Sequence, residues 1–167
     1  PLMANQTSIG VDWRTRSFQN ERSFKNENMY TSLYYRHPGE TGIEDLGVSE
    51  GNKNKSVSTS VDWVAFKQQY FTTAIIPQSV DFTYADLAYQ TLPEKSGFIK
   101  EYSMSAAVPY TMQTAGYKFD LYLGPNKFPV LKKLADANGD SLNLERVIPL
   151  GWIFSTYVSR WVVIPLF

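Results

Sequence analysis

Cysteine is absent from this 167-residue chain, which excludes disulfide bonds, thiolate metal sites and cysteine nucleophiles. Histidine occurs only once, as His37. An excess of charge is also missing, because sixteen basic and sixteen acidic residues give a formal net charge of zero. Binding to nucleic acid or to an anionic membrane surface through overall charge is therefore not expected. We predict no metal, no cofactor and no nucleic-acid partner.

Long hydrophobic runs are lacking too. No segment reaches the roughly 20 consecutive apolar residues that span a bilayer, and the first residues show no basic region followed by an apolar core. With 43% hydrophobic and 19% charged residues, the composition is that of a folded domain with one core. Because the chain does not begin with methionine, we expect it to be a piece of a longer protein.

Alternation of apolar and polar residues predicts a mainly β fold. From 98 to 112 the even positions are apolar, with Lys100 as the exception, and several odd positions are polar. Pro109 has no N–H for a ladder, so the run should bend, bulge or lie at an edge there. Further strands are predicted at 9–18, 29–36, 82–92 and 117–123. The stretch from Leu46 to Ser60 is predicted to be a long polar loop, with a strand start near Ser56 as an option.

The run from Trp63 to Pro77, W-V-A-F-K-Q-Q-Y-F-T-T-A-I-I-P, packs aromatic and β-branched residues around a Gln68-Gln69 pair and carries no catalytic side chain. Its aromatic spacing fits a helical stripe, whereas its threonines and isoleucines favour a strand. We favour an extended run with a tight start and a scaffold role.

Two helices are predicted late in the chain. Asn126 can cap a helix near 126–137 that leaves Lys132 and Lys133 in solvent and ends at Asn138-Gly139. A second, amphipathic helix is predicted from Leu150 to Ile164, with Ser155, Thr156, Ser159 and Arg160 on its polar side. Its apolar face consists of Ile153, Phe154, Tyr157, Val158, Trp161, Val162 and Ile164.

This apolar face must be covered, because burying its seven side chains is worth on the order of 10 kcal/mol. Large aromatic and aliphatic residues beside a narrow polar strip suit a membrane interface. A helix docked on its own core is the alternative on sequence grounds.

Three landmarks carry a resemblance to a known family. The run from Trp63 to Pro77 resembles the W-V-A-x-x-Q-Q-Y-F-x-x-A-x-I-P pattern in the periplasmic domain of the YidC-type membrane protein insertases. The segment from Leu121 to Lys127, L-Y-L-G-P-N-K, is similar to that family's L-Y-x-G-P segment. Gly151-Trp152 lies where a G-W pair introduces the amphipathic helix that leads to the insertase core. The sequence of the C-terminal part resembles that of Bacteroidetes members of the family. The resemblance implies scaffold roles for Trp63, Gln68, Gln69, Tyr70, Phe71, Pro77, Gly124 and Pro125.

The resemblance also implies a fold, a β-supersandwich of the galactose-mutarotase type. Residues 1–148 would form the sandwich, including the helix near 126–137, and residues 149–167 the amphipathic helix leading toward a missing membrane core. The family's periplasmic region is longer, so at least one sheet should be incomplete, with an exposed edge open to self-association or another partner.

The implied function is that of a non-catalytic periplasmic domain of an insertase in the bacterial inner membrane. The implied partners are components of the Sec translocon, nascent membrane proteins and, through the last helix, the membrane interface. The alternative is a carbohydrate-binding or mutarotase-like sandwich module. Mutarotation needs a histidine and a carboxylate, but His37 sits in a turn before Pro38-Gly39, where we expect a solvated side chain. The sides on which Tyr34, Tyr35, Tyr84 and Tyr89 lie stay open.

Overall fold

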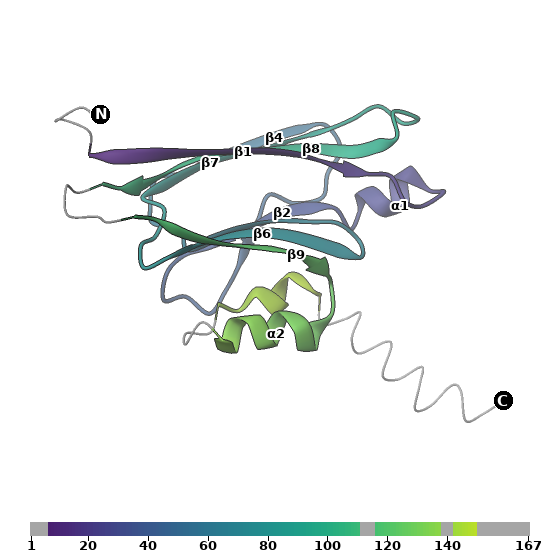
Figure 1. The fold of residues 1–167 in the computed structure, drawn as a ribbon. Coiled ribbons are helices and arrows are strands. Elements are labelled where there is room, and N and C mark those ends of the chain that lie inside the picture. The colour runs from purple at the N-terminus through teal and green to yellow at the C-terminus, as the bar shows by residue number, and fades with distance from the viewer. Residues whose placement is uncertain (1–6, 111–115, 138–141, 150–167) are drawn as a thin grey trace, which may run out of the picture. The chain divides into compact units, whose positions relative to one another are not determined.

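The computed structural model describes residues 7–110, 116–137 and 142–149. The chain divides into two compact units, residues 1–124 and 125–167. The first unit contains two antiparallel sheets that face each other, with the short helix α1 beside them (Figure 1). The elements are β1 (Ser8–Phe18), α1 (Phe24–Asn28), β2 (Ser32–Arg36), β3 (Glu44–Asp45), β4 (Asn52–Val57), β5 (Trp63–Lys67), β6 (Phe71–Gln78), β7 (Tyr84–Thr91), β8 (Phe98–Pro109), β9 (Lys118–Pro125), α2 (Phe128–Ala137) and the 3-10 turn η1 (Leu144–Val147). The predicted mainly β sandwich is confirmed.

The first sheet has the strand order β1-β8-β7-β4. Its central strand β8 alternates as the sequence indicated, since Tyr102, Met104 and Ala106 are buried while the residues between them are partly exposed. The strand ends at Pro109, which removes the next ladder donor. Lys100, the exception in the pattern, is fully buried.

The second sheet has the order β3-β2-β5-β6-β9. All five residues of β5 are buried, on both faces of the strand, which explains its nearly unbroken apolar sequence. The run from Trp63 to Pro77 is extended as predicted, but its tight turn is in the middle. The Gln68 N–H donates to the Phe71 carbonyl at 2.8 Å, which closes a hairpin between β5 and β6.

The core lies between the two sheets. Phe66 of β5 packs between Trp13 of β1, at a ring distance of 4.6 Å, and Tyr102 of β8, on which it stacks at 5.0 Å. Tyr35 and Tyr89 belong to the same core, whereas Tyr84 lies on the outer face of its sheet, 39% exposed. Each fully buried apolar side chain contributes about 1.5–3 kcal/mol to folding.

Two predicted stretches need correction. Residues 46–60 are not one continuous loop, because β4 occupies Asn52–Val57 and pairs along β7, so the strand begins earlier than the predicted option near Ser56. The predicted strand at 29–36 begins only at Ser32, because α1 and its C-terminal turn precede it. Ser23 caps α1 by accepting from the Asn26 N–H at 3.2 Å, and the Glu27 carboxylate accepts from the N–H groups of Asn20 and Glu21.

The sheet edges differ in how they are protected. Edges β4 and β3 are joined by an ion pair between Lys55 and Glu44. Edges β1 and β9 each have a strand on one side only among the described strands. Two apolar residues of β9, Leu121 and Leu123, are 55% and 67% exposed. Within the described residues, both of these edges are open to a further strand.

In the second unit, α2 and η1 contact each other. Leu131 of α2 and Leu144 and Val147 of η1 are buried, while Lys132 and Lys133 are exposed as predicted. The predicted helix near 126–137 is therefore confirmed. It begins at Phe128, so Lys127 takes the N-cap position expected for Asn126, and its carbonyl accepts from the Leu131 N–H at 3.1 Å.

Candidate C-terminal features cannot be placed in the same way. Asn138-Gly139 and the predicted helix from Leu150 to Ile164 lie outside the described residues. None of the helices that the structure does describe is long and apolar enough to span a bilayer.

Candidate functional site

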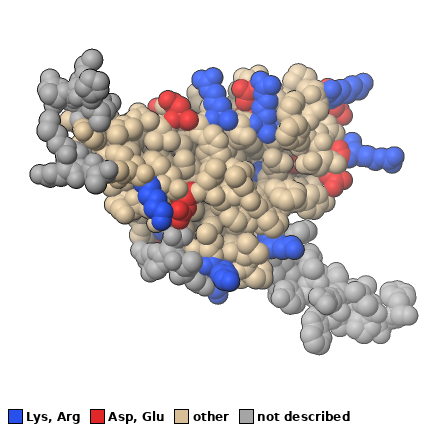
Figure 2. Space-filling view, viewed as in Figure 1, with Lys and Arg blue, Asp and Glu red and all other residues tan. Residues whose placement is uncertain are grey.

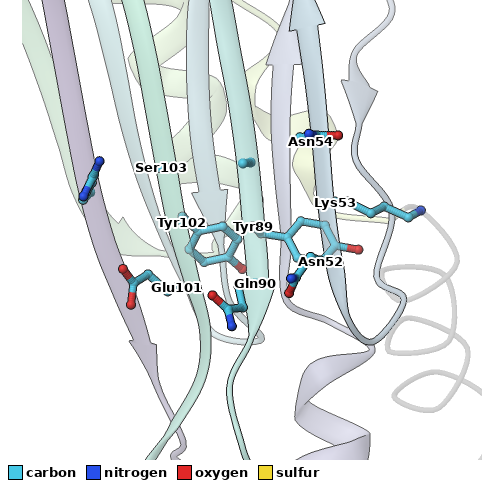
Figure 3. A pocket seen from close by; sticks show the side chains of 10 residues that line it. Asn52, Lys53, Asn54, Tyr89, Gln90, Glu101, Tyr102 and Ser103 are labelled. Carbon is cyan, nitrogen blue, oxygen red and sulfur yellow. The ribbon is translucent and has the colours of Figure 1, made fainter.

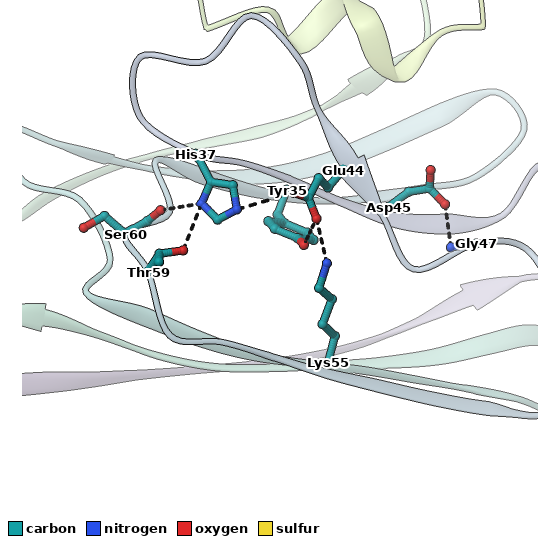
Figure 4. Close-up of polar contacts among 8 residues, drawn as sticks. All are labelled: Tyr35, His37, Glu44, Asp45, Gly47, Lys55, Thr59 and Ser60. Atoms are coloured by element: carbon teal, nitrogen blue, oxygen red, sulfur yellow. Dashed lines mark hydrogen bonds and ion pairs between the residues drawn. The ribbon is translucent and has the colours of Figure 1, made fainter.

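The chain's one histidine lies in a polar cluster where the edges of the two sheets meet (Figure 4). His37 follows β2, and its Nε2 faces Oε1 of Glu44 in β3 at 3.6 Å. The other oxygen of that carboxylate, Oε2, accepts from the Tyr35 hydroxyl and from Lys55 Nζ at 2.6 Å. Three strands, β2, β3 and β4, thus supply the groups around one carboxylate.

The histidine ring is held from its other side as well. Nδ1 of His37 lies 2.8 Å from the Ser60 carbonyl, which can only accept, so Nδ1 carries a hydrogen and donates. The side chain is 19% exposed, and the expected solvated histidine is therefore wrong. The turn at Pro38-Gly39 is present, but the residue before it packs against the loop that follows β4.

The charges of the cluster reinforce one another. Hydrogen bonds from Lys55 and Tyr35 lower the pKa of Glu44, and the hydrogen bond to Glu44 raises the pKa of Lys55. Both side chains of this pair are 45% exposed, so the pair is worth at most about 1 kcal/mol. Because the carboxylate is already occupied by protein groups, the cluster favours a connection between edges over acid–base catalysis on a substrate.

Two buried lysines form a second polar feature, at the junction of α1 and β2. Lys67 of β5 donates to the Tyr30 carbonyl at 2.9 Å, and Lys100 of β8 donates to the Thr31 carbonyl at 2.7 Å. The Lys100 ammonium also lies 4.2 Å from the centre of the Tyr89 ring. Burial lowers the pKa of both lysines to about 8, with nearby Lys53 adding to the effect on Lys100.

Sequence reasoning marked one of these lysines without finding its role. Lys100 broke the apolar alternation of its strand, and Lys67 ended an apolar run. Their shared target, two successive carbonyls at the end of a five-residue helix, depends on tertiary structure that no local pattern reveals.

A shallow polar hollow lies on the outer face of the first sheet (Figure 3). One register row crosses its four strands as Asn54, Ala88, Ser103 and Arg14. The small side chains of Ala88 and Ser103 form the floor, while longer polar residues stand around it. This row is shared by two adjoining hollows of about 340 and 330 Å³. On the face in Figure 2, basic and acidic side chains of the described residues are interspersed.

The signature residues differ in how far they are buried, and Gln68 and Gln69 are half-buried. Trp63 and Pro77 are buried in their strands, whereas Tyr70 and Phe71 at the hairpin are 41% and 54% exposed. The Tyr70 hydroxyl donates to the Glu21 carboxylate at 3.0 Å and accepts from Gln69 Nε2 at the same distance.

The need for glycine at position 124 is explained by Tyr122, two residues earlier in the same strand. A Cβ at this position would lie 2.6 Å from the Tyr122 hydroxyl oxygen, because the tyrosine side chain folds over the glycine. Pro125 follows and its carbonyl accepts from the Lys127 N–H at 2.8 Å. The L-Y-x-G-P segment thus forms the end of β9, and two residues separate it from α2.

Residues 4–167 match the family model described as the YidC periplasmic domain. The chain belongs to this family. Similar proteins include the membrane protein insertase YidC of Porphyromonas gingivalis, which is 30% identical over 97% of this chain, and that of Phocaeicola vulgatus, 34% identical over 96%. The YidC of Bacteroides fragilis is 29% identical over 99% of the chain.

These YidC relatives are Bacteroidetes proteins, which confirms the resemblance found in the sequence. The chain covers 26% of the length of each of the three. It therefore corresponds to about a quarter of a YidC insertase. The seven residues predicted to form the apolar face of the last helix lie in 150–167, outside the described residues.

Proposed function

We propose that this chain is the periplasmic part of a membrane protein insertase that assists the insertion and folding of inner-membrane proteins. The observation that carries the proposal is the match to the YidC periplasmic domain across residues 4–167, together with relatives that are named membrane protein insertases. No covalent chemistry is assigned to it. The polar cluster around Glu44, whose carboxylate is engaged by protein groups, agrees with a role without catalysis.

In this proposal the sandwich faces the periplasm and works through contact. It would bind partners, among them Sec translocon components and nascent membrane proteins. Its C-terminal segment would position the insertase core beside the membrane. Insertion itself is physical chemistry, because a polar path lowers the free energy of moving polar groups into the bilayer.

A domain exchange tests this function directly. The matching region of the Bacteroides fragilis insertase is replaced by this chain, and insertion of membrane proteins is followed after depletion of the native insertase. We expect the chimera to restore insertion and to expose the domain to protease added to the periplasm. A chimera that places the domain in the cytoplasm, or that fails although it accumulates normally, would contradict the proposal.

The last helix provides a second prediction. If residues 150–164 lie in a membrane interface, lipid vesicles should shift the fluorescence of Trp161 to the blue. The signal of Trp161 is obtained as the difference between the full chain and its Trp161→Phe variant. Unchanged emission at saturating lipid would count against membrane contact.

Matched charges separate the two faces of this helix. Val158→Asp places a carboxylate on the predicted apolar face, whereas Ser159→Asp places it on the predicted polar side. We expect vesicle binding to fall at least about tenfold for Val158→Asp and to change little for Ser159→Asp. Equal effects of the two substitutions would show that the face assignment is wrong.

A carbohydrate-binding module is the second candidate, and the polar hollow on the first sheet favours it. Tyr84 is an exposed aromatic residue on the outer face of the same sheet, outside the lining of the hollow, and an aromatic ring can stack on a sugar. Binding of common glycans that is lost in a Tyr84→Ala variant would support this function. No binding at millimolar concentration would leave the insertase function as the better account.

A further inference from the structure

The contacts of Glu44 with Tyr35, His37 and Lys55, which we call the β3 junction, hold a short strand at the side of the sandwich (Figure 4). Strand β3 has two residues, and residues 37–43 connect it to β2. Of these, residues 38–42 are exposed, whereas Tyr35 before them and Leu46 after β3 are buried. Because β3 is so short, side-chain contacts contribute much of its attachment to the sandwich.

The protonation state of His37 determines one of these contacts. Its Nδ1 donates to the Ser60 carbonyl at 2.8 Å, so in the neutral ring Nε2 has a lone pair and no hydrogen. This lone pair faces Oε1 of Glu44 at 3.6 Å, and two hydrogen-bond acceptors repel each other. Protonation converts Nε2 into a charged donor directed at the carboxylate. The repulsive contact then becomes an ion pair.

The other groups around the ring leave this effect in place. Thr59 Oγ1 lies 3.3 Å from Nδ1, and the Tyr35 ring meets the imidazole edge-on at 5.5 Å. The Lys55 ammonium opposes a positive ring, but it is bound to the other carboxylate oxygen, Oε2, at 2.6 Å. Hydrogen bonds from Lys55 and Tyr35 lower the pKa of Glu44, so this carboxylate stays charged in mild acid, where histidine gains a proton.

The charged residues next to the cluster in the sequence are engaged elsewhere. Arg36 Nε donates to the Asp62 carboxylate at 2.8 Å. Asp45 accepts a backbone N–H two residues further on, at 2.5 Å. Glu40 lies in the exposed part of the connection, where water screens its charge. Glu44 is therefore the carboxylate that responds to the charge of the ring.

We propose that the β3 junction is a pH-dependent switch, in which protonation of His37 pairs it with Glu44 and tightens the attachment of β3 and residues 37–43 to the sandwich. In the neutral state β3 is held by its two residue pairs with β2 and by Lys55. The closed junction binds the proton more tightly than the open one, so acid favours closure. The switch consists of contacts within this chain and does not depend on the insertase function.

The state of the ring can be measured directly, because His37 is the chain's one histidine. Nitrogen-15 NMR spectra of the labelled 1–167 chain distinguish its two ring nitrogens. At pH 8 we expect the hydrogen on Nδ1 and none on Nε2. A neutral ring with its hydrogen on Nε2 would overturn the proposal, since that ring could donate to Glu44 without gaining a proton.

The backbone amide of Glu44 reports whether the junction is closed. The Leu46 N–H donates to the Leu33 carbonyl at 3.0 Å, so Glu44 and Tyr35 form the next hydrogen-bonded pair of this antiparallel ladder. We expect the hydrogen-exchange protection factor of the Glu44 amide to be at least about threefold higher at pH 5.5 than at pH 7.5. The slowest amides of β8 serve as the reference for global unfolding.

Three variants separate the switch from a general effect of pH. His37→Asn keeps a donor for the Ser60 carbonyl but does not titrate, and Glu44→Gln keeps the side-chain size without the charge, so each should abolish the difference. Asp45→Asn removes the same charge one position away and should preserve it. Protection that does not rise in acid, a rise that persists in His37→Asn, an equal loss in Asp45→Asn, or a Glu44 amide unprotected at both pH values would each overturn the proposal.

Discussion

At the scale of single residues, the two buried ammonium groups of Lys67 and Lys100 are the least expected feature. They are 4% and 0% exposed, and neither has an ion-pair partner among the described residues. Carbonyl oxygens and, for Lys100, the face of Tyr89 replace the water that each charge loses on folding. Such groups replace hydration incompletely, which is why burial lowers the pKa of both lysines.

Stability should consequently rise with pH on the alkaline side of neutrality. The folded chain releases the lysine protons at a pKa of about 8, whereas an unfolded lysine holds its proton to its ordinary value of 10.5. Between these values the unfolded state binds more protons, so the free energy of unfolding increases with pH. We expect a gain of about 1.5 kcal/mol for each lysine between pH 8 and 9.5 in urea titrations.

Two variants provide the control for this pH dependence. Lys67→Met and Lys100→Met keep most of the side-chain volume and remove the titrating amine, so each should flatten part of the rise. The measurement stops at pH 9.5, because partly buried tyrosines such as Tyr34, whose pKa burial raises to about 12, begin to lower stability at higher pH. A wild-type profile without any rise would show that these lysines are better solvated than their burial indicates.

At the scale of elements, the hairpin β5–β6 assigns different roles to two phenylalanines of one signature. Phe66 is 2% exposed and lies between Trp13 and Tyr102, whereas Phe71 is 54% exposed. We expect Phe66→Ala to lower the free energy of unfolding by about 3–5 kcal/mol and Phe71→Ala by less than about 0.5 kcal/mol. Chemical denaturation of both variants measures this, and a large loss for Phe71→Ala would mean that its ring is covered.

The elements also show where local sequence is informative. Strands β8 and β9 were predicted because each alternates apolar and polar residues with a period of two, and β1 because β-branched and aromatic residues lie between polar stretches. Strand β4 reads N-K-N-K-S-V and has no such face, since only Val57 is buried, so its pairing with β7 leaves little trace in composition. The five-residue α1 is shorter than the stripe by which a helix is recognised.

The candidate site was less predictable than the strands. His37 and Glu44 were visible in the sequence, but Lys55 belongs to a strand that was interpreted as loop, so the cluster could not be assembled. The Tyr122–Gly124 contact could be anticipated only in part, because the resemblance marked Gly124 and not the tyrosine that covers it.

At the scale of the whole molecule, strand order is the property that local patterns do not contain. β1 pairs with β8 although the paired residues stand 80 (Phe18 and Phe98) to 101 (Ser8 and Pro109) positions apart in the sequence. The sandwich was nevertheless predicted, because the family resemblance supplied the topology that alternation alone leaves undetermined. The zero net charge likewise appears in space as interspersed signs on the visible face.

The hydrogen bonds from Lys67 and Lys100 to the carbonyls of Tyr30 and Thr31, at the α1–β2 junction, affect how long the folded state lasts. These two contacts join residues 37 and 69 positions apart, so they can close only after β5 and β8 are both in place. Lys100→Ala should therefore speed unfolding in stopped-flow experiments and leave the refolding rate unchanged. Slower refolding would show that the contact forms early. We expect this junction to govern the lifetime of the sandwich, while the strands themselves govern the speed of its formation.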